Sequence, residues 1–115
     1  ALTRADAGRP VDVARHDADF HRLLVRAAHN RVLLLSKEPS SLLVQPTTAR
    51  IIAGNPAGIP RLIEAHTRIV DAVERQDAAG AQLWVQRHLR DWRKGFDRLG
   101  LDIDSPVSEW DGRET

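Results

Sequence analysis

Cysteine is absent from the 115 residues of this chain, and so is methionine. Without cysteine there are no thiol nucleophiles, no thiolate zinc sites, no redox motifs and no disulfides. Histidine nitrogen and carboxylate oxygen therefore remain as the strong metal ligands. The missing thiols are also typical of a reducing compartment, so we expect a cytoplasmic protein.

Long hydrophobic runs and a surplus of one charge are missing as well. No stretch approaches the roughly 18 apolar residues of a membrane span, and the N-terminal segment ALTRADAGRP is too charged for a signal peptide. The chain has 17 Lys and Arg residues against 16 Asp and Glu residues, a net charge of +1. The missing apolar run leads us to expect no membrane partner. Because binding nucleic acid needs a clustered basic surplus, we also expect no direct DNA binding by this chain.

The hydrophobic residues, 42% of the chain, recur mainly at the three- and four-residue steps typical of helices. Three main helices are predicted, over about 11–29, 60–75 and 77–99. No alternation typical of strands occurs, so the predicted fold class is all-α, an antiparallel helical bundle. We expect a single domain over 1–115, with an ordered core at about 11–100 and a loose tail at 101–115 that Trp110 pins.

Proline and glycine interrupt the middle of the pattern. Between Ser36 and Pro60 the apolar pieces are short, with prolines and glycines between them. Because proline removes a backbone donor and breaks helices, we expect a connection here that holds only one or two short helical turns. Asn30, just before the apolar run at 32–35, is a good N-cap for that run.

Three of the five histidines lie on otherwise apolar helix faces. Asp17 and His21 are four residues apart, which places both side chains on one face with Cβ atoms about 5–6 Å apart. His66 lies 11 residues before the turn at Asp77 and His88 lies 11 residues after it, so an antiparallel hairpin brings them level. At 1.5 Å rise per residue, that level is roughly 16 Å from the turn. A divalent cation is one partner that satisfies three such imidazoles and a carboxylate.

The same residues also have a simpler interpretation. A single inward histidine is more often a hydrogen-bonded core residue than a ligand, and Asp17 with His21 can form an ordinary ion pair on a helix. Trp84 and Trp92 lie four residues before and after His88, where they either wall a pocket or pack in the core. Spacing alone leaves both interpretations open.

Three segments, in order, resemble one known family. The first runs from Asp17-Ala-Asp-Phe20-His21 to Asn30, the second is Glu64-Ala-His66-Thr-Arg-Ile-Val, and the third is Asp77-Ala-Ala-Gly-Ala81 with His88-Leu89. The pattern resembles the effector-binding FCD domain of FadR-type GntR transcription regulators. The resemblance covers about 17–89, and the three parts together are more specific than any one of them.

The resemblance implies an antiparallel α-helical bundle in which one Asp and three His hold Zn²⁺, Ni²⁺ or Mn²⁺. The matched metal ligands are Asp17, His21, His66 and His88. It also implies a pocket for a small organic acid effector, a homodimer, and a regulatory rather than an enzymatic function. Asn30 matches the asparagine that follows the first ligand-bearing helix in the family. Asn30 and Trp84 are candidates for contacts to the effector.

The chain departs from that family in what precedes the first ligand. Only 16 residues come before Asp17, and none of them resembles the winged helix-turn-helix domain of such regulators. We therefore expect a fragment that lacks the first bundle helices and reaches DNA only through an N-terminal domain outside this chain. Two alternatives use the same residues differently: a small metal-dependent hydrolase in which the ion activates water, and a metal-free helical dimerisation module.

Overall fold

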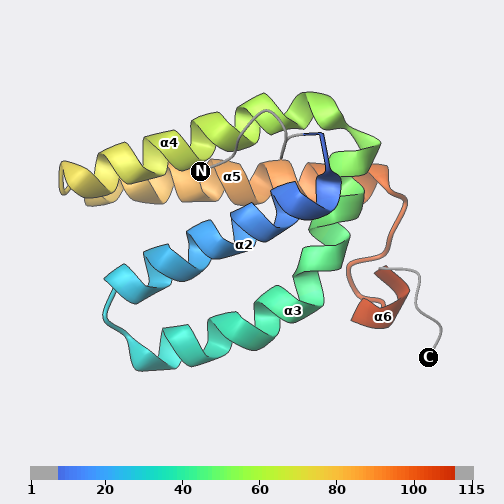
Figure 1. Cartoon of the computed structure of the whole chain (residues 1–115), viewed down its shortest axis with the longest axis horizontal. Helices are drawn as coiled ribbons and strands as arrows, with labels where there is room; N and C mark the ends of the chain where they lie inside the picture. Colours follow the sequence, from blue (N-terminus) through green and yellow to red (C-terminus); the bar gives the residue numbers. More distant parts are fainter. Residues whose placement is uncertain (1–7, 111–115) are drawn as a thin grey trace.

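The computed structural model describes residues 8–110, except for the side chains of residues 108 and 109. This part of the chain contains helices and no strand, which confirms the all-α fold class (Figure 1). The elements are α2 (Pro10–Ala27), α3 (Arg31–Gly54), the 3-10 turn η1 (Pro56–Gly58), α4 (Ile59–Glu74), α5 (Ala78–Arg98) and the short α6 (Val107–Trp110). None of the described helices combines the length and the apolar character that crossing a membrane requires.

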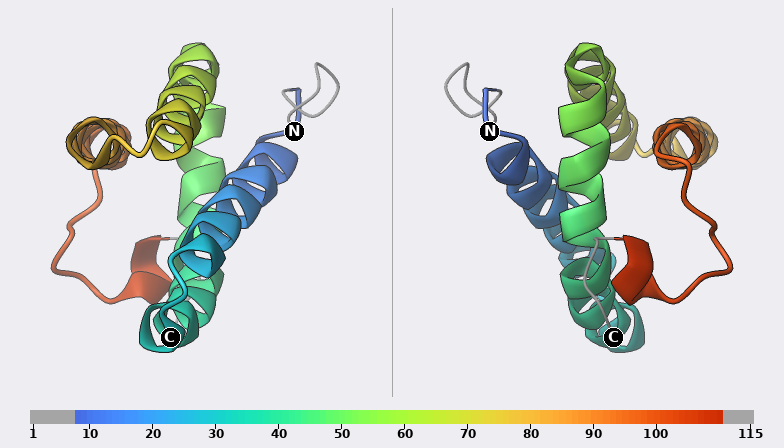
Figure 2. Two further views of the ribbon diagram at one scale, coloured as in Figure 1. Left: turned by 90° about the vertical axis from the view of Figure 1, so that its left-hand side faces the viewer. Right: turned by 90° about the vertical axis from the view of Figure 1, so that its right-hand side faces the viewer.

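The four long helices pair in chain order into two hairpins. α2 packs along α3, and α4 runs antiparallel beside α5 (Figure 1). α3 also packs on α5, and this contact joins the two hairpins into one bundle (Figure 2). Gly95 allows the close approach, because a Cβ at this position would lie 2.3 Å from Cγ2 of Ile51.

The core includes an aliphatic cluster and an aromatic cluster. The first is aliphatic and consists of Val13, Ile52 and Ile59, with Leu62 packed against them. The second is aromatic: the fully buried Phe96 stacks on Trp92 with ring centroids 5.3 Å apart and meets Trp110 edge-on at 5.1 Å. The indole Nε1 of Trp110 also donates to the Asp102 carbonyl oxygen and to Ser105 Oγ, each at 3.1 Å. Trp110 thus pins the start of the expected tail, whereas residues 111–115 lie outside the described part.

The stretch between Ser36 and Pro60 differs from the expected connection. Up to Gly54 it continues α3 as one helix of 24 residues, with Pro39 and Pro46 inside it. The prediction of short helical turns is therefore wrong for most of this stretch. Only η1 is a short turn of the expected kind.

Packing explains why α3 tolerates two interior prolines. Each proline removes one backbone hydrogen bond and costs roughly 3 kcal/mol in a helix interior. The helix bends along its length, as helices do at prolines (Figure 1). It nevertheless buries four side chains in the bundle: Ser41, Thr47, Thr48 and Ile52. Tertiary contacts of this kind, rather than local propensity, supply most of a helix's stability, and a sequence pattern does not reveal them.

The ends of the helices follow the sequence signals. Asn30 caps α3, where its side-chain oxygen accepts a hydrogen bond from the backbone N–H of Leu33 at 3.1 Å. Asp77 caps α5 in the same way by accepting from the N–H of Gly80 at 2.9 Å. Gly100 follows α5 with a φ of +73°, a conformation that glycine adopts without strain.

Substitution of Asn30 tests the cap of α3. Asn30→Ala removes the acceptor for the Leu33 N–H, and we expect the free energy of unfolding to fall by about 1 kcal/mol. Asn30→Asp keeps an acceptor and serves as the matched control, with an expected change below about 0.5 kcal/mol. Urea unfolding followed by circular dichroism measures both variants. Equal stability of the Ala variant and the unsubstituted protein would show that the cap contributes nothing.

Candidate metal centre

Three helices bring one carboxylate and three imidazoles to the same point. Asp17 and His21 lie one turn apart on α2, His66 lies on α4, and His88 lies on α5. Counting from the turn predicts that His66 and His88 are level, and their ring centroids are indeed 4.9 Å apart. One possible ligand atom from each of the four side chains lies within 4.8 Å of the others.

The three imidazoles converge on Oδ1 of Asp17. This oxygen lies 2.9 Å from Nε2 of His66 and 3.3 Å from Nε2 of His21. It lies 3.6 Å from Nε2 of His88, which is itself 3.2 Å from Nε2 of His21. Ligand atoms held about 2.1 Å from one ion are about 3.0 Å apart at right angles and about 3.4 Å apart at tetrahedral angles. These separations match the donor spacing around a single divalent ion.

Two of these atoms have no hydrogen-bond partner among the described residues. Asp17 Oδ1 and His66 Nε2 are both buried, and although they are close, their orientation makes no hydrogen bond. His21 and His88 face each other through their Nε2 atoms, so one of them must carry a proton there unless a cation lies between them. Because buried polar atoms are nearly always satisfied, the donor set fits a bound metal.

The charge state of the cluster suits a cation as well. Burial raises the pKa of Asp17, but its contacts with His21, His66 and His88 lower the pKa by more, to well below its ordinary value. Burial lowers the pKa of His66, and the neighbouring Asp17 carboxylate opposes this only in part. Asp17 is therefore ionised and His66 neutral at neutral pH, which are the forms that coordinate metals.

Phe20 holds two of the imidazoles in place. Its ring stacks on His66, with centroids 3.8 Å apart and planes 5° from parallel. It meets His21 edge-on, with centroids 5.4 Å apart. Groups that contact the ligating side chains restrict their orientation, so Phe20 is a positioning residue of the cluster. It belongs to the first of the three sequence segments, directly before His21.

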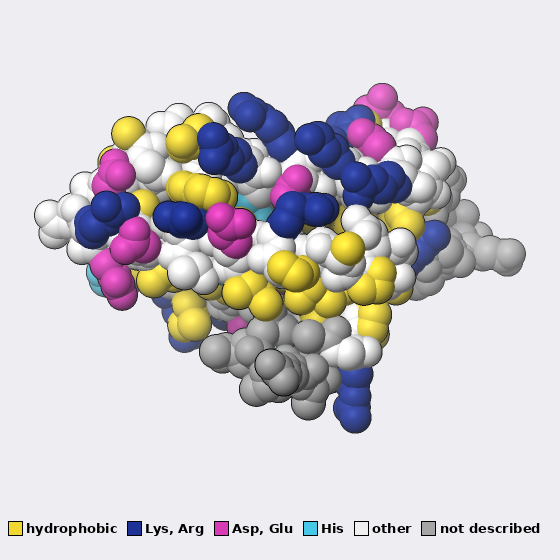
Figure 3. Space-filling model, turned by 90° about the horizontal axis from the view of Figure 1, so that it is seen from above, with side chains coloured by type: hydrophobic (Ala, Val, Ile, Leu, Met, Phe, Trp, Pro, Cys, Tyr) yellow, Lys and Arg dark blue, Asp and Glu magenta, His cyan; other side chains and the backbone are white. Residues whose placement is uncertain are grey.

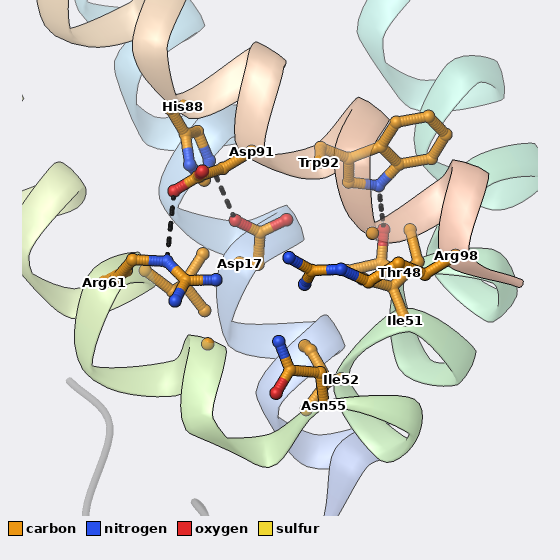
Figure 4. A pocket seen from close by; sticks show the side chains of 13 residues that line it. Asp17, Thr48, Ile51, Ile52, Asn55, Arg61, His88, Asp91, Trp92 and Arg98 are labelled. Atoms are coloured by element: carbon orange, nitrogen blue, oxygen red, sulfur yellow. Dashed lines mark hydrogen bonds and ion pairs between the residues drawn. The ribbon is translucent and has the colours of Figure 1, made fainter.

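An open cavity lies beside Asp17 and His88 (Figure 4). Its apolar side chains are Ile51, Ile52, Leu62 and Trp92, and its polar side chains include Thr48, Asn55, Arg61 and Arg98. Trp92 donates a hydrogen bond from Nε1 to Thr48 Oγ1 at 3.0 Å, which fixes that part of the wall. Of the wall residues just named, the sequence pattern pointed only to Trp92. Those on α3 were missed because they lie in the stretch expected to be a connection.

The two candidates for effector contacts lie elsewhere. Asn30 is exposed at the start of α3, where it forms the cap, and it does not line the cavity of Figure 4. Trp84 lies on α5, with the guanidinium carbons of Arg68 and Arg87 5.6 and 5.0 Å from its ring centroid. It lines a second groove that His88 also borders. Neither residue is in the wall beside Asp17.

The fold and the cluster together define an all-α domain with a buried carboxylate and three histidines beside a cavity. A family model described as the FCD domain matches residues 2–91. Because this match covers well over half of the chain, the chain belongs to the FCD domain family. This membership supports an effector-sensing domain of a regulator. Comparisons with curated proteins and with solved structures each found no match.

Proposed function

We propose that this chain is the effector-sensing domain of a GntR-type transcription regulator and that it works with a divalent metal ion. The observation that carries the proposal is the convergence of three imidazoles on Asp17 Oδ1 beside a largely apolar cavity. The residues that would hold the ion are Asp17, His21, His66 and His88. When bound, the ion supplies a Lewis acid that coordinates a carboxylate oxygen of the effector.

The donor set narrows the choice of metal. The family resemblance implies Zn²⁺, Ni²⁺ or Mn²⁺, and imidazole nitrogen with carboxylate oxygen is compatible with all three, whereas the chain has no thiolate that would favour softer ions. Four protein ligands leave positions open on a six-coordinate ion. A small organic acid can occupy those positions, and the adjacent cavity gives it room.

The position of the cluster explains how effector binding could reach the rest of a regulator. Asp17 and His21 belong to the first hairpin, and His66 and His88 belong to the second. The cavity is likewise lined by α3 from the first hairpin and by α4 and α5 from the second. An effector that binds better to one arrangement of the hairpins shifts the population toward it. An attached N-terminal domain would carry that shift to DNA.

A small metal-dependent hydrolase has less support. It needs a general base beside the ion. Asp19 on α2 pairs with Arg22 at 3.2 Å, and its side chain is 51% exposed. Asp91, which lines the cavity, pairs with Arg61 at 3.5 Å. Each of these carboxylates is already paired with an arginine, so neither is free to act as that base. The other alternative, a metal-free dimerisation module, does not explain why the buried Oδ1 of Asp17 makes no hydrogen bond with the described residues.

Metal content tests the proposed ligands. Protein purified without chelator should contain about one divalent ion per chain by mass spectrometry. His66→Ala removes one donor, so we expect metal content to fall at least about tenfold and the rise in Tm on addition of Zn²⁺ or Ni²⁺ to disappear. The matched control is His29→Asn, since His29 is exposed and has a φ of 53° that asparagine tolerates. Metal-free protein whose His66→Ala variant melts unchanged would contradict the site.

Binding of organic acids tests the sensing function. The metal-loaded protein should gain several degrees in Tm with at least one small carboxylic acid, because a ligand at about 100 times its Kd stabilises the native state by about 2.7 kcal/mol. Chelator-stripped protein should show no such gain, because the proposed binding partner of the effector's carboxylate is the metal ion. Alcohols with the same carbon skeletons are the control compounds. If no acid in a broad panel shifts the Tm of metal-loaded protein, the sensing proposal is wrong.

We also propose that the chain forms a homodimer. A groove between α2 and α4 contains apolar side chains that are strongly exposed. Leu23 is 64% exposed, Ile63 43% and Val70 40%. Exposed apolar side chains that gather in one groove with polar residues around them are typical of an interaction site. A second copy of the chain is the partner that the family resemblance suggests.

Sedimentation equilibrium tests the dimer. We expect a concentration-dependent dimer, and Val70→Glu should weaken it at least about tenfold because a charge would enter the apolar contact. Leu42→Glu is the control, since Leu42 is 74% exposed and lies outside the groove between α2 and α4. A chain that sediments as a monomer at every concentration contradicts this proposal.

A further inference from the structure

The cavity beside the cluster contains a positive charge with no acidic partner among the described side chains. Arg98, in the last turn of α5, extends into the cavity, and Arg61 extends into it from α4 (Figure 4). Arg61 pairs with Asp91 at 3.5 Å. No described acidic side chain pairs with Arg98. Its guanidinium group is therefore available to hold an anionic group of a ligand.

The charges that face the cavity match a ligand with two anionic groups. A divalent ion on one carboxylate and three neutral imidazoles has a net charge of about +1. The Arg61–Asp91 pair is neutral as a whole, and Arg98 adds a second positive charge. A monocarboxylate at the metal would neutralise only the first of these two charges. A dicarboxylate neutralises both.

The remaining wall indicates what lies between the two anionic groups. Ile51, Ile52, Leu62 and Trp92 present apolar surface to the cavity. Burying a hydrocarbon segment against such surface is favourable, whereas a hydroxyl group would lose hydration there. This apolar part of the wall favours a hydrocarbon segment between the two acid groups.

We propose that the effector is a short dicarboxylic acid, with one carboxylate at the metal held by Asp17 and the three histidines and the other at Arg98. This inference rests on the proposed function and deepens it, because it names the class of effector. Arg98 becomes the residue that separates dicarboxylates from monocarboxylates. The amide of Asn55 is a further polar group in the same cavity (Figure 4).

The surface around α4 and α5 favours the approach of such a dianion. Although the whole chain is almost neutral, α5 contains five basic and two acidic residues. Lys and Arg side chains gather over α4 and α5 on the face shown in Figure 3. Arg87, Arg90 and Lys94 line the groove that His88 borders. A basic surface beside a site raises the rate at which anions reach it.

Calorimetric titration of the metal-loaded protein tests the proposal with acids matched in carbon number. Succinate should bind at least about tenfold more tightly than butyrate, and glutarate more tightly than valerate by a similar factor, because only the dicarboxylates reach Arg98. Arg98→Gln should remove this preference, because the second carboxylate then has no cationic partner. Arg93→Gln is the matched control, since Arg93 lies on the same helix, pairs with Asp97 at 3.0 Å and is outside the cavity.

The outcomes separate this inference from the proposed function. Equal affinities for succinate and butyrate, or an Arg98→Gln variant that weakens both alike, would overturn the dicarboxylate proposal and leave the sensing function intact. Tighter binding of 3-phosphonopropionate than of succinate would also overturn it, because the second group would then be phosphoryl. Protein that holds no metal, or metal-loaded protein that binds no acid at all, would overturn the proposed function as well.

Discussion

A single buried carboxylate oxygen, Oδ1 of Asp17, is the constraint on which the arrangement of the helices depends. Burial of an ionised group is costly unless partners surround it. Three imidazoles from α2, α4 and α5 face this oxygen at distances that suit a shared cation, so folding must bring these helices to one point. α2 otherwise packs mainly on α3, and α4 packs mainly on α5. The cluster therefore ties the two hairpins together, in addition to the contact between α3 and α5.

The same junction is where we expect the effector to bind. The cavity opens on Asp17 and His88, and α3, α4 and α5 form its walls. A ligand at this place touches both hairpins, so its binding energy depends on how they are arranged. Membership of the FCD family and the geometry of the cluster support the same conclusion from separate observations. We propose that Arg98 makes the site selective, because it supplies a second positive charge to the cavity.

The sequence predicts those features that depend on local spacing. Counting residues from the turn at Asp77 brings His66 and His88 level, and a four-residue step pairs Asp17 with His21. The part of α3 that follows Ser36 could not be predicted, because its two prolines argue against a helix and only burial against its neighbours compensates for them. For the same reason, the sequence did not predict the cavity wall that α3 supplies. The approach of Ile51 to Gly95 likewise depends on tertiary packing, which no local pattern encodes.

Anomalous diffraction tests the central claim most directly. Crystals of protein grown without chelator and supplied with Zn²⁺ or Ni²⁺, with data collected on both sides of the absorption edge, locate the ion independently of any assumed ligand. We expect one strong anomalous peak about 2.1 Å from Asp17 Oδ1 and from Nε2 of His21, His66 and His88. Ordered side chains in the positions described here with no peak between them would contradict the account.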